Sequence, residues 1–325
     1  MDTTVALVRT RPETVLADYA RLLRLAGLGE PAGGGARPPI ALLLEPAAPR
    51  ERPAATCPPW QLDGVIRALL GAGWPADELA AIAPAARGGG ADARRAWRGV
   101  LADCGVDSTL QPPPAADRGR VHLVLSGLRT HRSLGVSAAL LAAAAHLLPP
   151  AQRRDLDWRP DVLAAAWRRQ TAPPIVGAVV DATVCGDGPA PALQVPVAAH
   201  LLLAGRDAVA VDVVAAQLLG CAPRTLPLTR AMAAAGLGCD DLARIAIAGD
   251  IADSLPSLGL IEAARYGGPP GADGLRWLRR FRSLRPVSPL RVVAVRKGRR
   301  RYEDLAWGRL QRDYDDRSRR AGGAS

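Results

Sequence analysis

Short apolar runs alternate with longer segments of helical pattern along most of this chain. Apolar runs of four to six residues are typical of buried strands in a parallel sheet, because such strands are covered on both faces. Longer segments with apolar positions three and four residues apart predict helices. The runs predict strands at residues 4–8, 40–44, 79–83, 121–125, 175–180 and 245–248, and the longer segments predict helices at residues 12–28, 61–74, 91–106, 136–148 and 208–219.

The regular alternation of strand and helix predicts the fold class. It indicates an α/β domain over residues 1–275, in which a largely parallel sheet carries helices on both faces. A loop rich in Pro and Ala marks a candidate sub-domain boundary near residues 115–120. Residues 276–325 are predicted to form a basic extension and tail, with a helix at 275–284 and a strand at 290–296.

Composition allows a large apolar core, and charge separates the body from the extension. Hydrophobic residues make up 49 % of the 325 residues, and the net charge is +11. Residues 276–320 contain 16 basic and five acidic residues, so the rest of the chain is neutral overall. A neutral body disfavours nucleic-acid binding. The extension is predicted to be a solvated basic tail or an arm that contacts a second copy of the chain. The alternative is a surface that binds nucleic acid or an acidic protein partner.

Cysteine spacing and hydropathy bear on location and cofactors. The five cysteines include no CxxC pair and no cluster that could hold zinc or an iron–sulfur centre. No uncharged apolar run has the length and character of a membrane span, and the first residues do not resemble a secretory signal. We therefore expect a cytoplasmic protein with reduced thiols, no bound metal and no cofactor.

Ligands bind at the carboxyl ends of parallel strands in such sheets, so the segments after predicted strands are candidate sites. Residues 125–140 place Arg129, His131 and Arg132 between a predicted strand and a predicted helix. Two guanidinium groups at a helix N-terminus favour an anionic ligand. They would also hold His131 in its neutral form, which suits a general base, and Ser137 could cap the helix. The alternative is a surface turn with a structural histidine.

A second polar segment follows the predicted strand at residues 175–180. Asp181 at the strand end could accept a proton, coordinate a ligand or cap a turn. Gly186 and Gly188 allow the backbone to approach a ligand closely, although the segment lacks the lysine and the spacing of a phosphate-binding loop. Cys185 is expected to be an inert thiol. This segment is therefore predicted to contribute Asp181 and the two glycines to a substrate site.

A third polar segment begins the predicted helix at residues 208–219. Asp207 occupies the N-cap position, where a carboxylate accepts backbone N–H groups. Asp212 lies in a run of Ala and Val, and a helix that is apolar all round is buried. A buried carboxylate needs an arginine, a histidine or backbone N–H groups as partners. Asp212 is therefore predicted either to make a structural ion pair or cap, or to orient His131 at a shared site.

Together these segments resemble the family named domain of unknown function 362. The resemblance rests on Arg129-Thr130-His131, on Asp181 with the CGDGP sequence after it, and on AGRDAVAVDVVAAQLLG at residues 204–220. It implies an α/β fold and adds Thr130 and Asp207 to the candidate substrate-binding residues. The chain departs from the family at Leu141-Ala142, where members carry Lys-Asn, and it lacks the ferredoxin-like cysteine motifs of many members.

The leading hypothesis from the sequence is an enzyme of specialised metabolism that binds an anionic or polar small molecule. It would carry out cofactor-independent acid/base chemistry, namely isomerisation, elimination or cyclisation. The three polar segments would meet around one cavity at the carboxyl edge of the sheet. His131 would be the acid/base there, Asp212 or Asp181 would orient it, and Arg129 and Arg132 would bind the anion. One alternative is a non-catalytic accessory or redox-partner protein for a separate iron–sulfur protein, with the basic extension as its docking arm. A third possibility is a family member whose pocket has become structural.

Overall fold

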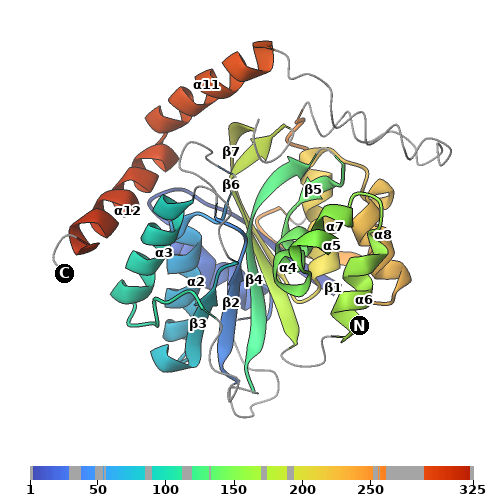
Figure 1. Cartoon of the computed structure of the whole chain (residues 1–325), viewed down its shortest axis with the longest axis horizontal. Coiled ribbons are helices and arrows are strands. Elements are labelled where there is room, and N and C mark those ends of the chain that lie inside the picture. Colours follow the sequence, from blue (N-terminus) through green and yellow to red (C-terminus); the bar gives the residue numbers. More distant parts are fainter. Residues whose placement is uncertain are drawn as a thin grey trace.

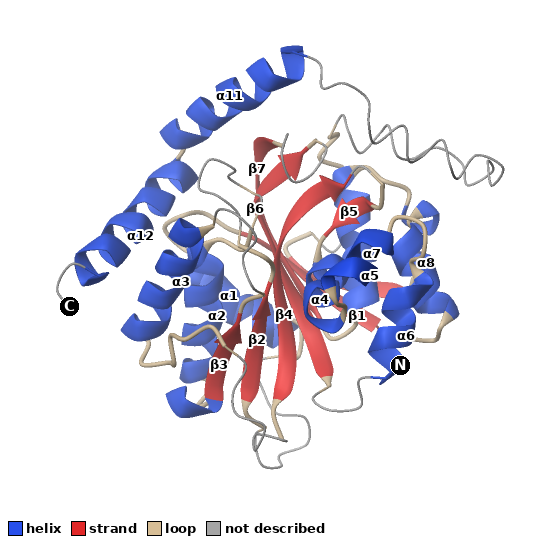
Figure 2. Ribbon diagram, in the orientation of Figure 1, coloured by secondary structure: helices blue, strands red, loops and turns tan. Residues whose placement is uncertain are grey.

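The computed structural model describes residues 3–28, 38–47, 54, 56–84, 90–111, 119–131, 133–169, 174–188, 194–251, 255, 257–260 and 289–322. These residues form one eight-stranded, mostly parallel sheet and ten α-helices, which confirms the expected α/β class (Figure 2). The strands are β1 (Thr3–Arg9), β2 (Ile40–Leu44), β3 (Leu79–Ile82), β4 (Val121–His131), β5 (Gly135–Ser137), β6 (Ile175–Asp187), β7 (Val195–Gly205) and β8 (Ile245–Gly249). The helices are α1 (Val15–Leu25), α2 (Pro59–Gly71), α3 (Ala91–Asp103), α4 (Ala139–Leu147), α5 (Pro150–Asp155), α6 (Asp161–Arg169), α7 (Ala208–Leu219), α8 (Pro227–Ala234), α11 (Pro289–Asp304) and α12 (Ala306–Gly322).

The sheet has the strand order β3-β2-β4-β6-β7-β1-β8, and β5 pairs with the end of β4. β2, β3, β4 and β6 run parallel to one another, and β1 runs parallel to β8. β7 lies antiparallel between β6 and β1 and so joins the two parallel groups. The strands on both sides of residues 115–120 pair within this one sheet.

Helices cover both faces of the sheet, as the alternating pattern predicts (Figure 1). One apolar core lies under α1, α2, α3 and α12, and the other lies under α4, α6, α7 and α8. Neighbouring residues of a strand point to opposite faces, so Leu125 joins the first core and Val124 the second. In the described part of the chain, no helix has the length and apolar character needed to cross a lipid bilayer.

β4 and β6 continue beyond the apolar runs that predicted them. β4 extends to His131 because β5 pairs with its last residues, and β6 extends to Asp187 because β7 pairs alongside it. The turn expected at Arg129–His131 and the strand end expected at Asp181 are therefore wrong, because these residues are extended strand. The sequence analysis did not predict β7, in which Pro196 and His200 interrupt the apolar residues and the first half is only partly buried.

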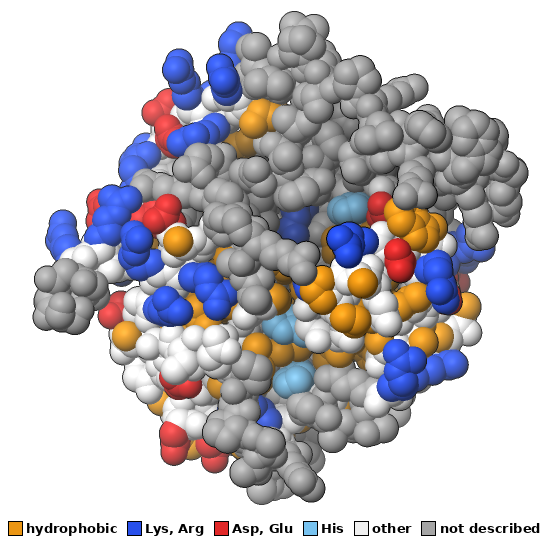
Figure 3. Space-filling view, viewed as in Figure 1, with side chains coloured by type: hydrophobic (Ala, Val, Ile, Leu, Met, Phe, Trp, Pro, Cys, Tyr) orange, Lys and Arg blue, Asp and Glu red, His pale blue; other side chains and the backbone are white. Residues whose placement is uncertain are grey.

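The basic extension folds back onto the body in two helices. α11 lies against β7, and α12 lies against α3 and α2 (Figure 1). The strand expected at residues 290–296 is wrong, because these residues belong to α11, whereas the helix expected at 275–284 lies outside the described residues. Basic side chains gather along the outer side of α11 and α12 (Figure 3).

Buried aromatic side chains attach α12 to the body. The Tyr314 hydroxyl donates to Asp63 Oδ2 at 2.6 Å. Trp307 donates from Nε1 to His200 Nδ1 at 3.1 Å, and its ring packs on Trp60 with 5.4 Å between the ring centroids. This half of the extension is thus part of an apolar core and is not a free arm.

Candidate functional site

The connections that follow β2 and β4 lie on opposite faces of the sheet. After β2 it crosses one face through α2 and adds β3 on the outer side, whereas after β4 it crosses the other face through α4 and leads to β6 on the opposite side. Adjacent parallel strands whose connections leave to opposite faces open a crevice at their carboxyl ends, and ligands bind there in α/β proteins. The carboxyl ends of β2 and β4 are therefore the candidate site.

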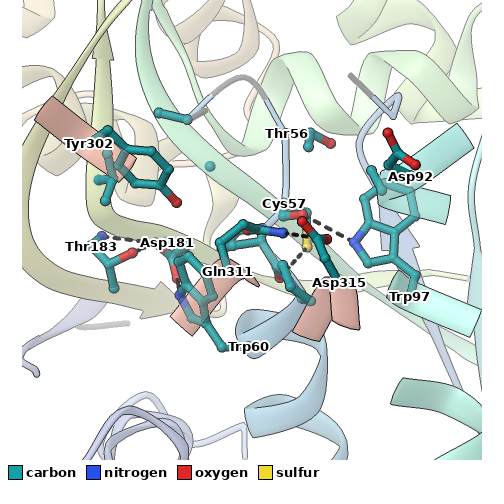
Figure 4. A pocket seen from close by; sticks show the side chains of 16 residues that line it. Thr56, Cys57, Trp60, Asp92, Trp97, Asp181, Thr183, Tyr302, Gln311 and Asp315 are labelled. Atoms are coloured by element: carbon teal, nitrogen blue, oxygen red, sulfur yellow. Dashed lines mark hydrogen bonds between the residues drawn. The ribbon is translucent and has the colours of Figure 1, made fainter. Parts of the chain in front are cut away.

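A cavity of about 60 Å³ lies at this point, on the face covered by α2, α3 and α12 (Figure 4). Its walls come from β4 and β6, from the N-terminal turns of α2 and α3, and from both C-terminal helices. The side chains that matter for its chemistry are Trp60, Asp92, Trp97, Asp181, Tyr302 and Asp315.

Asp181 lies on the cavity wall and is only 2 % exposed. Its Oδ2 accepts hydrogen bonds from the Tyr19 hydroxyl at 2.6 Å and from Trp60 Nε1 at 3.0 Å. Its Oδ1 accepts from the backbone N–H of Thr183 at 2.8 Å and from the Thr183 hydroxyl at 2.5 Å. A carboxylate has about four lone-pair positions, so these donors use all of them. Asp181 is thereby suited to act as a fixed negative charge and not to accept a proton.

Burial controls the pKa values around Asp181. It raises the pKa of the Asp181 carboxyl, and the hydrogen bonds from Thr183, Tyr19 and Trp60 oppose this rise. Burial also raises the pKa of Tyr19, and the negative charge of Asp181 raises it further. The pKa of Cys57 is raised by burial and then by the charges of Glu45 and Asp181. Both groups are therefore protonated at neutral pH, and they lie in a negative field.

Aromatic rings form two sides of the cavity. Trp60 and Tyr302 lie near Thr183, and Trp97 lies on the other side (Figure 4). Trp97 is fully buried and donates from Nε1 to the Cys57 carbonyl at 3.1 Å, which fixes the position of its ring. Tyr302 belongs to α11, so the C-terminal extension completes the cavity.

Arg129 lies beside the cavity and forms an ion pair with Glu45. Arg129 Nη2 and Glu45 Oε2 are 2.5 Å apart, and Glu45 Oε1 accepts the backbone N–H of Gly127, a lining residue, at 2.7 Å. Glu45 is 1 % exposed. The guanidinium charge expected to bind an anion is therefore balanced by a carboxylate of the protein, although the buried Nη1 has no hydrogen-bond partner among the described residues.

Thr130 and His131 hold the ends of neighbouring strands. The Thr130 hydroxyl donates to the Gly188 carbonyl at 2.9 Å and accepts the Gly188 N–H at 2.7 Å, which ties β4 to the end of β6. His131 is half-buried, and its Nδ1 accepts the backbone N–H of Leu134 at 3.2 Å. His131 is not among the described residues that line the cavity.

The helix cap expected from Ser137 is wrong, because Ser137 ends β5 and α4 begins after Ala138. Ser137 is buried, and its hydroxyl has no hydrogen-bond partner among the described residues. Arg132 lies outside the described residues, so its expected role as an anion-binding group stays a prediction.

Asp212 lies on the opposite face of the sheet from Asp181. It belongs to α7, and its carboxylate accepts the backbone N–H groups of Ala139 at 2.7 Å and Leu140 at 3.2 Å. Burial raises its pKa to about 7, against the effect of these two hydrogen bonds. Asp212 therefore caps α4, which was one of the two expected roles. The expectation that Asp212 and Asp181 share one cavity is wrong, because the sheet separates them.

The remaining predicted residues have structural partners. Asp207 is the N-cap of α7 and accepts the N–H of Val209 at 2.9 Å. Gly186 leaves room for Gln194, because a Cβ there would lie 2.9 Å from the Gln194 side chain. Cys185 is buried, and burial raises its pKa, which is consistent with an inert thiol.

Several residues of the site were missed in the sequence. The sequence analysis assigned no site role to Trp60 or Trp97, and the contribution of Tyr302 required the fold of the extension. Two signals were present: Pro58-Pro59 marks a helix start after a strand, and Glu45 follows the apolar run 40–44 in the same way that Asp181 follows 175–180.

Within the described ranges, no group of three or more His, Cys, Asp or Glu side chains could hold a metal ion. No protein-family model, no curated protein and no solved structure matches this chain. The case for a function therefore rests on the geometry of the chain itself.

Proposed function

We propose that this chain binds a small polar metabolite in the cavity between Asp181, the aromatic rings and the C-terminal helices. The buried Asp181 carboxylate carries the proposal, because it faces a cavity at the strand switch point and is held there by four hydrogen bonds. Burying a charge is costly, and buried carboxylates with shifted pKa values concentrate at functional sites. A ligand that contacts Asp181 would offset part of this cost.

The proposal gives Asp181 a binding role. Because its lone pairs are occupied, it is a poor general base. The acid/base reaction expected from the sequence depends on His131, whose Nδ1 accepts backbone N–H groups, so that the neutral ring carries its proton on Nε2. An isomerase, lyase or cyclase activity thus stays a prediction that the binding proposal does not require.

The resemblance to domain of unknown function 362 supports a site at the carboxyl ends of β4 and β6. Two of its motifs, at Arg129–His131 and at Asp181, lie on β4 and β6, which are neighbouring strands. The alternative of an accessory protein with a basic docking arm is less favoured, because Trp307 and Tyr314 attach α12 to the body.

A cavity-filling variant tests the proposal. Ala93 lines the cavity from α3, whereas Ala102 is an exposed residue of the same helix. Ala93→Leu should fill much of a cavity of about 60 Å³, and Ala102→Leu is its matched control. Native mass spectrometry of freshly purified wild-type and variant proteins would then measure any co-purified small molecule.

The proposal predicts a bound small molecule in the wild-type protein and in Ala102→Leu, and its loss in Ala93→Leu. Thermal unfolding of both variants shows whether they fold like the wild type. Retention of the same molecule by a folded Ala93→Leu protein would place the ligand elsewhere and overturn the proposal. If no molecule co-purifies, a metabolite library is screened for binding to the three proteins instead. The site is refuted if no library member binds the wild type and loses that binding in Ala93→Leu.

A further inference from the structure

On the basis of the proposed binding site, we propose that the ligand presents a cationic amine or ammonium group to this cavity. The sequence alone favoured an anionic or polar substrate. The lining of the cavity favours the opposite charge, and four features of the described residues lead to this conclusion: an uncompensated buried carboxylate, engaged arginines, aromatic walls and a small volume.

The first feature is the charge of the lining. The described residues that line the cavity include the three carboxyl side chains of Asp92, Asp181 and Asp315, and they include no Lys, Arg or His. Asp92 is at the more exposed side and pairs with Arg95 at 3.2 Å. Asp181 is different, because all four of its hydrogen-bond donors are neutral groups. A buried anion with neutral donors attracts a cation far more strongly than an exposed anion does.

The second feature is that arginines close to the lining residues in sequence already have partners. Arg129, two residues after Gly127, pairs with the buried Glu45. Arg94, next to Ala93, donates to the Pro84 carbonyl at 2.9 Å. Arg312, next to Gln311, donates to the Glu303 carbonyl at 2.6 Å. These three arginines are thus directed to other acceptors, and none of them is a hydrogen-bond partner of Asp181.

The third feature is the aromatic wall. Trp60, Trp97 and Tyr302 line the cavity together with the carboxylates. The faces of aromatic rings carry partial negative charge and attract ammonium groups, with tryptophan the strongest, and aromatic cages bind methylated ammonium ions in this way. Trp60 is also held in place by packing on Trp307 and by its bond to Asp181, so it is ordered before a ligand arrives.

The fourth feature is size. About 60 Å³ of the cavity is open to the centre of a water-sized sphere, so a primary ammonium group or a methylammonium group fits inside it. We therefore expect the cavity to recognise the amine end of a ligand whose remainder extends beyond it.

The test compares probes that differ in charge and match in length. Methylammonium, ethylammonium and n-propylammonium chloride are compared with ethanol and n-propanol, and with sodium acetate and propionate, at ionic strength matched with NaCl. The thermal unfolding midpoint of the wild type, Ala93→Leu and Ala102→Leu is measured against probe concentration, which gives an apparent affinity. Asp181→Asn removes the buried negative charge of the cavity. If this variant does not fold, Asp315→Asn removes another of the carboxylates that line the cavity.

Alkylammonium ions should raise the midpoint of the wild type and Ala102→Leu, and not that of Ala93→Leu. Removing the negative charge beside the ligand should weaken their binding roughly tenfold or more in Asp181→Asn. Alcohols of equal length should bind at least roughly tenfold more weakly than the ammonium ions. Carboxylates or alcohols that bind in the cavity with the same affinity as ammonium ions would refute the preference for a cationic ligand and leave the proposed site intact. If no ammonium ion has an effect that depends on Ala93, the inference is refuted, and the mass spectrometry above decides separately on the site.

Discussion

Replacing Asp212 by asparagine should change how the stability of the protein depends on pH. The Asp212 carboxyl is buried in α7 and caps α4 through the N–H groups of Ala139 and Leu140. Its pKa is about 7 in the folded protein against an ordinary value of 3.8. The amide of the Asp212→Asn variant would keep one acceptor for Ala139 but would turn a second donor toward Leu140, so the variant loses one hydrogen bond at every pH.

The sign of the pH effect follows from proton uptake. Between pH 4 and pH 7 the folded wild type holds a proton on Asp212 that the unfolded chain has released, so stability falls as pH rises through this range. From pH 5 to pH 8 the folded state keeps the extra proton over about two pH units. At about 1.4 kcal/mol per unit, this lowers the wild-type free energy of unfolding by about 2.5 kcal/mol. Asp212→Asn has no such term, while the other titrating groups are shared.

Urea unfolding followed by tryptophan fluorescence at pH 5, 6, 7 and 8 measures both free energies of unfolding. The wild-type value minus the Asp212→Asn value should decrease steadily by about 2.5 kcal/mol across this range. A difference that does not change with pH would show that the carboxyl is ionised with an ordinary pKa. Such a result would refute the account of this cap.

Other substitutions test the packing around the site. Gly64→Ala should lower the free energy of unfolding by about 1 to 3 kcal/mol, because its Cβ would lie 2.3 Å from the Tyr19 ring. The matched Gly71→Ala, whose Cβ meets no atom within 4 Å, should raise the free energy of unfolding by up to about 1 kcal/mol. Equal effects of the two variants in urea unfolding would contradict this packing. Glu45→Gln should cost about 3 to 5 kcal/mol by leaving the buried Arg129 charge unbalanced. The double variant with Arg129→Met should recover part of that loss, and a double variant as unstable as Glu45→Gln would argue against the ion pair.

Sequence patterns were sufficient for six of the eight strands of the sheet and for α1, α2, α3, α4 and α7. Apolar runs such as 40–44 and 121–125 correspond to strands because both faces of each strand are buried. The largely apolar α7 is buried for the same reason, and Asp207 caps it as its position predicts. These features depend on neighbouring residues and on burial, and apolar runs and cap positions in a single sequence predict both.

Polar residues within long strands could not be predicted in the same way. Asp181 looks like a strand end, yet β6 continues through it because Tyr19, Trp60 and Thr183 satisfy its carboxylate. Two of these partners are more than 100 residues away in the chain, at separations of 162 and 121 residues. The separation of Asp181 from Asp212 likewise depends on which face each side chain meets. The site therefore had to be read from the assembled fold.

The central claim is that a small ligand binds beside Asp181, between the rings of Trp60 and Trp97. Fluorine NMR of the protein labelled with 5-fluorotryptophan tests it directly, with the resonances assigned by single Trp→Phe variants. Adding the co-purified ligand or n-propylammonium should shift the resonances of Trp60 and Trp97 and leave the exposed Trp158 unchanged. Shifts confined to Trp158, or a ligand that binds without changing either buried resonance, would contradict the account.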